Sequence, residues 1–117
     1  MEEELLMGHE KLSIYPLSIE LIKWVSEDIA RKLSRDPQIA DQLARASSSI
    51  PLNIAEGSGK STERDKRRFY SIARGSAMEC SAIFDVMCAR NLVTSEERKK
   101  ARSLIRPIVG VLSKLCR

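Results

Sequence analysis

The residues best suited to chemistry in this sequence are basic, and five of them lie close together between positions 60 and 74. They are Lys60, Arg64, Arg67, Arg68 and Arg74. Arginine and lysine side chains on adjacent turns of a helix can contact successive phosphates. The segment therefore predicts a nucleic-acid-binding surface with a strong salt dependence and little sequence preference. The alternative is a solvated charged face whose arginines pair with Glu56, Asp65 or Glu79.

Residues that could support catalysis are sparse. The segment GSGK at 57–60 resembles a fragment of a phosphate-binding loop but lacks the preceding strand and the required spacing. Glu56 has no second carboxylate, histidine or nucleophile placed to work with it, and the single histidine, His9, lies near the acidic N-terminus. We therefore predict that the protein is not an enzyme and needs no cofactor. We expect Glu56 to be a structural partner of an arginine, either Arg68 or Arg74.

The three cysteines give no metal-binding pattern. Cys80, Cys88 and Cys116 show no C-x-x-C spacing. Cys80 and Cys88 are expected on one helix, about 12 Å apart along its axis, which is too far for a disulfide. We expect no bound metal and buried free thiols in a reducing compartment.

Composition indicates one all-α domain, spanning residues 1–117. Hydrophobic residues make up 43% of the 117 residues and aromatic residues only 4%, so the core must be built from aliphatic side chains, as in helix bundles. No apolar run is long enough to span a bilayer, and the acidic start MEEELLMGHE does not resemble a signal peptide. We therefore expect a cytoplasmic protein without membrane contact, whose residues 1–12 form a frayed arm.

Apolar spacing and capping residues predict four helices, at about 16–34, 36–59, 62–91 and 94–115. Asp36 and Pro37 are typical of a helix start, and Thr94 with Glu97 forms a capping box. The third helix is expected to bury one stripe, composed of Phe69, Ile72, Ala73, Ser76, Cys80, Ile83 and Met87. Short links between four helices favour an antiparallel up-down bundle.

The second helix contains the most distinctive pattern, a serine run followed by Pro51 and a glycine stop at Gly57 and Gly59. Proline in mid-helix predicts a bend near residues 47–50, where serine hydroxyls can bond freed carbonyls and let another helix approach. The structural motif comprises Pro51, Asn53, Glu56 and Gly57.

The segment SIPLNIAEGSGK, followed by STERDKRRFYSIARGSAMEC, resembles a family of small bacterial four-helix-bundle proteins encoded in intervening sequences of 23S ribosomal RNA genes. The resemblance covers about residues 17–115 and is densest at 42–79. It implies a ring-like homo-oligomer, a pentamer, without established enzymatic activity. The chain also bears a more distant resemblance to the accessory protein of diversity-generating retroelements, a basic pentameric bundle that works with a reverse transcriptase and nucleic acid.

The third helix has a second stripe, opposite its core face, whose C-terminal half is small or apolar. It contains Gly75, Met78, Ala82 and Val86. An isolated bundle would leave this strip partly in water, and a glycine inside a helix costs about 1 kcal/mol relative to alanine. The strip is therefore a candidate oligomer interface, although the small residues Gly75, Ser76 and Ala77 could instead pack only inside one protomer.

Two functions are consistent with these patterns. The first is a non-enzymatic oligomeric bundle that binds RNA or DNA through phosphates. The second is an interaction scaffold, or accessory factor, for a protein partner such as a reverse transcriptase. The first predicts binding by the isolated protein that weakens steeply with salt, whereas the second predicts little binding at any salt.

Overall fold

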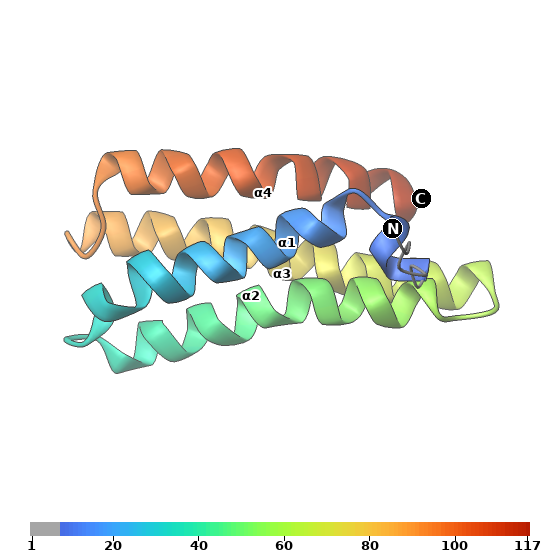
Figure 1. The fold of residues 1–117 in the computed structure, drawn as a ribbon, viewed down its shortest axis with the longest axis horizontal. Coiled ribbons are helices and arrows are strands. Elements are labelled where there is room, and N and C mark those ends of the chain that lie inside the picture. The colour runs from blue at the N-terminus through green and yellow to red at the C-terminus, as the bar shows by residue number, and fades with distance from the viewer. Residues whose placement is uncertain (1–7) are drawn as a thin grey trace, which may run out of the picture.

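The computed structural model describes residues 8–117, and within them the chain forms four long helices and no strand (Figure 1). They are α1 (Ile14–Trp24), α2 (Pro37–Ser58), α3 (Glu63–Ala89) and α4 (Ser95–Leu115). A short 3-10 helix, η1 (Gly8–Lys11), precedes α1 within the arm that was expected to fray. Residues 1–7 of that arm lie outside the described part.

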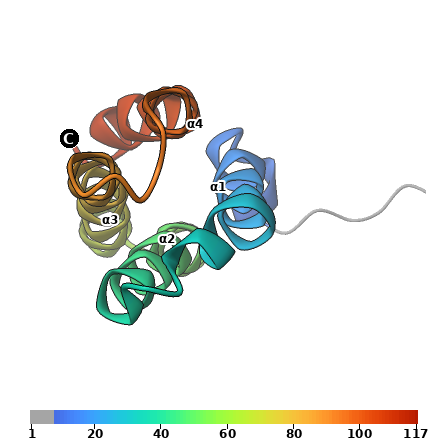
Figure 2. The same ribbon diagram turned by 90° about the vertical axis from the view of Figure 1, so that its left-hand side faces the viewer.

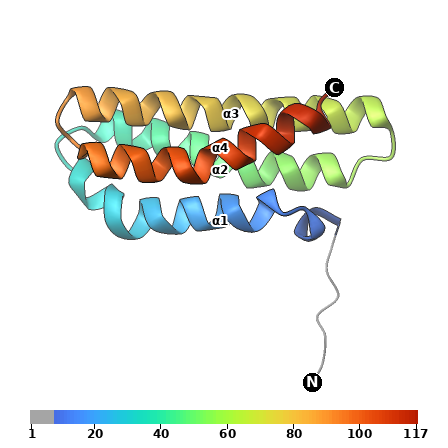
Figure 3. The same cartoon turned by 90° about the horizontal axis from the view of Figure 1, so that it is seen from above.

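The helices surround one core. Seen along the helices, α1 neighbours α2 and α4, and α3 lies between α2 and α4 on the other side (Figure 2). The α1–α2 and α3–α4 links lie at one end of the molecule, and the α2–α3 link and the C-terminus lie towards the other end (Figure 3). In the core, Trp24 stacks on Phe84 with ring centroids 5.5 Å apart, and the buried indole anchors the packing.

Local capping residues set the starts of three helices. Asp36 accepts a hydrogen bond from the Ile39 amide, and Pro37 occupies the first position of α2, where no donor is needed. Thr62 caps α3 in the same way. Thr94 and Glu97 form both hydrogen bonds of the capping box at the start of α4. These boundaries match the sequence prediction to within about two residues.

The first predicted helix is not one regular α-helix. α1 ends at Trp24 and continues as a π-helical turn, η2 (Val25–Ile29), and a 3-10 turn, η3 (Ala30–Leu33). Trp24 and Val25 are adjacent in sequence, yet each is only 7% exposed. A wider turn allows the inward face to include both residues and then to continue through Ile29 and Leu33, which are also buried. Apolar spacing alone gave no signal of this change.

Pro51 does not interrupt α2, which is helical from Pro37 to Ser58 and is followed by Gly59. The Ser47 hydroxyl donates to the Leu43 carbonyl at 2.7 Å. A proline at position 51 has no N–H to donate to the Ser47 carbonyl, so that carbonyl is the one left free. The Ser47 hydroxyl bonds the Leu43 carbonyl instead, so it does not satisfy the freed carbonyl as the sequence predicted. α4 likewise continues through Pro107 and Gly110.

The predicted core stripe of α3 is partly wrong. Ile72 is 42% exposed, and Phe69 and Ser76 are half-buried. Instead, Tyr70, Ala77 and Phe84 join the core beside the correctly predicted residues. The reason is that the other helices select the buried arc of α3: Tyr70 fills the space beside Gly57 of α2, and Phe84 stacks on Trp24 of α1.

The thiols also differ from expectation, since only Cys80 is buried while Cys88 and Cys116 are half-buried. Within residues 8–117, no helix is both long and apolar enough to cross a bilayer.

Candidate nucleic-acid interface

The basic residues lie around the hairpin between α2 and α3, and Gly57 allows these two helices to meet there. A Cβ atom at position 57 would lie 2.8 Å from Cε1 of Tyr70, closer than real Cβ contacts come. Tyr70 is 7% exposed, so its ring fills the space that the missing side chain leaves. Burial, together with the charge of Glu63, raises the pKa of Tyr70 above its ordinary value, so the phenol stays neutral. The glycine of the motif thus fixes the packing of the hairpin.

Ser49 of the serine run joins α2 to α3, and Asn53 of the motif holds Ser49 in place. Asn53 donates to the Ser49 carbonyl at 2.8 Å and to the Ser49 hydroxyl at 2.9 Å. The Ser76 hydroxyl of α3 donates to the same Ser49 oxygen at 2.7 Å. Small hydroxyl side chains therefore do allow a second helix to approach, as the serine run predicted.

Two of the predicted phosphate-binding cations flank one aromatic ring. The Nζ atom of Lys60 lies 5.1 Å from the centroid of the Phe69 ring, and Cζ of Arg68 lies 5.5 Å from it. Lys60 also pairs with Glu56 at 3.1 Å. The proposed pairing of Glu56 with Arg68 or Arg74 is therefore wrong, because a lysine four residues along the chain reaches the carboxylate first.

Lys66 is a further basic residue of this end that was not among the predicted site residues. Its Nζ atom donates to the Ser58 carbonyl at 3.1 Å, at the C-terminus of α2. A cation is favourable there because the last carbonyls of a helix have no partner within it and carry partial negative charge. Lys66 therefore stabilises the hairpin as well as adding charge.

Arg74 lies apart from the hairpin cations. Its Nε atom donates to the Ser113 hydroxyl of α4 at 2.7 Å, so it pairs with none of the three acidic residues considered from sequence. Arg64, Arg67 and Arg68 have no ion pair with any residue in the described part of the chain. Of the five predicted residues, the structure thus gathers Lys60, Arg64, Arg67 and Arg68 at the hairpin end and places Arg74 towards α4.

The candidate interface residues of α3 all lie on its outer face. Met78 is 48% exposed and Val86 is 40% exposed, and Ala82 is also exposed. A Cβ atom added to Gly75 would meet nothing within 4 Å. The alternative, that Gly75, Ser76 and Ala77 pack inside the protomer, holds for Ala77, which is fully buried, and for Ser76, which bonds Ser49 of α2, but not for the exposed Gly75.

The described residues offer few groups for catalysis or metal binding. No group of three or more His, Cys, Asp or Glu side chains within residues 8–117 is arranged to hold a metal ion. His9 contacts the edge of Tyr15, with ring centroids 4.7 Å apart. Burial raises the pKa of Cys80 to about 12, so this thiol stays protonated near neutral pH. What the site can do is attract anions.

Comparisons with known proteins agree with this fold. Residues 10–114 match the family model described as 23S rRNA-intervening sequence protein. The fold also matches the crystal structure of a protein with unknown function from the S23 ribosomal protein family of Bacteroides thetaiotaomicron VPI-5482. That match has a TM-score of 0.80 and 18% sequence identity, and it covers 89% of this chain and 98% of that chain. At this identity the likeness shows the fold alone.

No protein with a curated function matches the chain. The family model nevertheless spans nearly all of it, including the hairpin, the basic residues and the outer face of α3. The chain therefore belongs to the 23S rRNA-intervening sequence protein family.

Proposed function

We propose that this protein is a non-enzymatic, ring-like homo-oligomer of antiparallel up-down bundles that binds nucleic acid through phosphates. The observation that carries the proposal is the gathering of basic side chains at the α2–α3 end, where three arginines have no ion pair in the described part of the chain. No ion pair with a described residue neutralises the charge of Arg64, Arg67 and Arg68, so these guanidinium groups are available to bind phosphate oxygens.

Carboxylates near the α2–α3 hairpin reduce the positive charge of the basic residues only in part. Glu56 is engaged by Lys60, and Glu63 and Asp65 lie in the first turn of α3, where the helix dipole favours acidic residues. Within residues 56–68, five basic residues therefore face three acidic ones, and this segment carries a net positive charge.

Assembly would strengthen such binding without any new kind of contact. Several copies in one ring present the same cations side by side, and linked sites raise the overall affinity well above that of one site. A pentamer is the assembly that we expect. The exposed Met78 and Val86 on α3 support assembly, because apolar side chains at these exposures are more stable when covered.

The test combines size and binding on one sample. Light scattering gives the mass of the assembly, and fluorescence anisotropy with labelled RNA and DNA gives affinity at several salt concentrations. We expect an oligomer whose log affinity falls linearly with log salt, by about 0.7–0.9 for each phosphate contacted. Replacing Arg64, Arg67 and Arg68 with glutamine should reduce that slope by up to about 2.1–2.7 for each protomer engaged.

A matched control removes the same charge elsewhere. The triple variant Lys23→Gln, Arg31→Gln, Arg35→Gln lies on and after α1, and it should leave the slope nearly unchanged. If both triple variants weaken binding equally, net charge alone is responsible and the hairpin is not the site. An oligomer that binds neither RNA nor DNA at low salt would refute the binding proposal and favour the protein scaffold.

A further inference from the structure

The outer face of α3 carries a stripe that none of the helices of its own bundle covers. We refer to four of its residues, Gly75, Met78, Ala82 and Val86, as the outer stripe. Ala82 lines two grooves at once, one between α2 and α3 and the other between α3 and α4. The stripe is therefore the ridge between the two grooves, and the charges on its two sides can be compared at the same level of the bundle.

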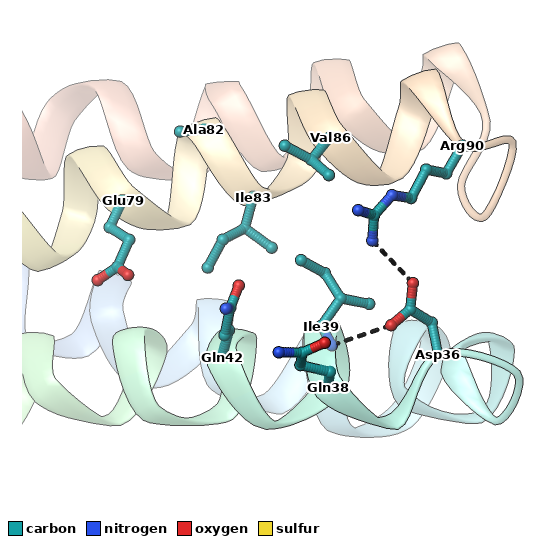
Figure 4. A pocket seen from close by; sticks show the side chains of 9 residues that line it. All are labelled: Asp36, Gln38, Ile39, Gln42, Glu79, Ala82, Ile83, Val86 and Arg90. Carbon is teal, nitrogen blue, oxygen red and sulfur yellow. Dashed lines mark hydrogen bonds and ion pairs between the residues drawn. The ribbon is translucent and has the colours of Figure 1, made fainter.

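The side towards α2 carries one unbalanced negative charge. Figure 4 shows this groove, which has a volume of about 350 Å³ and is lined in part by Gln38, Gln42 and Glu79. Its other charges cancel, since Arg90 pairs with Asp36 at 2.9 Å. Further along, Arg45 pairs with Asp41 at 3.0 Å. The Glu79 carboxylate makes no hydrogen bond or ion pair with any described residue, and it points into the space between α3 and α2 (Figure 4).

The side towards α4 carries the opposite charge. This groove, about 480 Å³ in volume, has apolar walls from Met78 and Val109 and two arginines, Arg102 and Arg106. Among the described residues that line it, Asp85 alone carries a carboxylate, and it is already paired with Arg98 at 2.6 Å. Neither Arg102 nor Arg106 has an ion pair with a residue in the described range.

The wall of this second groove also allows a close approach. Gly110 lies within α4, and a Cβ atom added there would meet nothing within 4 Å. A glycine inside a helix costs about 1 kcal/mol relative to alanine, and no contact within the protomer requires it. Gly75 on the stripe has the same open surroundings. Both glycines are explained if another backbone packs against this face.

We propose that a second copy of this chain covers the outer stripe with the two α3 helices parallel, so that Glu79 of one copy faces Arg102 and Arg106 of its neighbour. Parallel packing brings the α2 side of one copy onto the α4 side of the next, so negative charge meets positive. Antiparallel packing brings arginine onto arginine and Glu79 onto Glu79, which is repulsive. This inference rests on the proposed oligomer and specifies how its copies are oriented.

The same parallel orientation, with the copies turned about a common axis, is also the one found in a closed ring. If all copies are co-oriented about an axis along the bundle, each presents its arginine side to the Glu79 side of the next copy. Such a head-to-tail contact uses two different surfaces, which is the kind of interface that generates rings.

Charge exchange tests the orientation. We would measure assembly mass by light scattering for three variants. The first is Glu79→Arg, the second combines Arg102→Glu with Arg106→Glu, and the third combines all three changes. Each of the first two places like charges in contact and should raise the dissociation constant of the assembly by roughly 30-fold or more. The triple variant restores opposite charges across a parallel interface, so it should assemble like the wild type.

The controls and contrary outcomes test the parallel packing separately from the proposed oligomer. Glu20→Arg and the double variant Lys23→Glu, Arg35→Glu change equal charges away from the stripe and should leave assembly intact, with circular dichroism confirming the fold of every variant. A triple variant that stays dissociated while the wild type assembles would refute parallel packing. Assembly unaffected in all three variants would show that another surface holds the oligomer. A wild type that is monomeric at every concentration would refute the proposed oligomer itself.

Discussion

The substitution Gly57→Ala tests the packing that holds the hairpin of α2 and α3 together. The new Cβ atom would lie 2.8 Å from Cε1 and 3.0 Å from Cδ1 of Tyr70, and 3.2 Å from Cβ of Phe69. The tyrosine ring is buried and cannot swing into solvent, so the chain must shift. Overpacking of this kind costs about 1–3 kcal/mol of folding free energy.

One effect opposes that cost. Alanine favours the helix over glycine by up to about 1 kcal/mol, although less so here because Gly57 is the penultimate residue of α2. The net result is a loss of about 1 kcal/mol, which lowers the melting temperature by about 4 °C for a chain of this length. Urea denaturation followed by circular dichroism at one fixed protein concentration measures it, because stability of an oligomer depends on concentration.

The matched control is Gly59→Ala, two residues away. A Cβ atom there would lie at an ordinary 3.6 Å from the Ala55 and Glu56 carbonyls, and the backbone at Gly59 has a φ of −86° that alanine adopts readily. It should change stability by less than about 1 kcal/mol, in the stabilising direction if at all. A double-mutant cycle completes the test: in a Tyr70→Leu background, Gly57→Ala should no longer destabilise. Equal effects of Gly57→Ala in both backgrounds would refute the explanation.

Two further predictions concern titratable groups. Desolvation raises the pKa of Glu97, but hydrogen bonds from Lys32 and the capping box outweigh it and hold that pKa below its ordinary value. The ionised Glu97 therefore stabilises the fold above the ordinary carboxyl pKa, and this stabilisation is lost as the pH falls through the lowered pKa of Glu97. The urea midpoint of the wild type should fall below about pH 4.5, and Glu97→Gln should make that fall shallower. Burial raises the pKa of Cys80 to about 12, so iodoacetamide at pH 8 should label half-buried Cys88 and Cys116 first, as mass spectrometry would show; early labelling of Cys80 would contradict its burial.

Features that depend on residues within one helical turn could be predicted from sequence. Asp36 with Pro37, and Thr94 with Glu97, mark helix starts because their bonds reach only three residues along the chain. The four-helix, all-α fold followed from these signals and from apolar spacing. The π-helical turn after Trp24 did not, because it depends on which side chains the other helices bury.

In the candidate site, too, local features could be predicted from sequence and tertiary contacts could not. Sequence found the basic segment, and the i to i+4 spacing of Glu56 and Lys60 was available as a signal for the observed pair. The partners of Arg74 and Lys66 could not be predicted, since Ser113 and Ser58 are brought near only by the packing of α4 and by the hairpin. Gly57 was assigned as a helix stop, whereas its contact with Tyr70 shows a second, tertiary reason for glycine.

α3 links the two proposals, because its two halves do different things on the same outer face. The N-terminal half carries Arg64, Arg67 and Arg68, and the C-terminal half carries the outer stripe. If the stripe assembles the copies, their hairpin ends must lie on the same side of a parallel assembly, and every copy adds its arginines to one continuous basic surface. An antiparallel assembly would divide that surface between two opposite ends. The orientation inferred from Glu79 and the α4 arginines is therefore also the one in which avidity for a phosphate backbone is greatest.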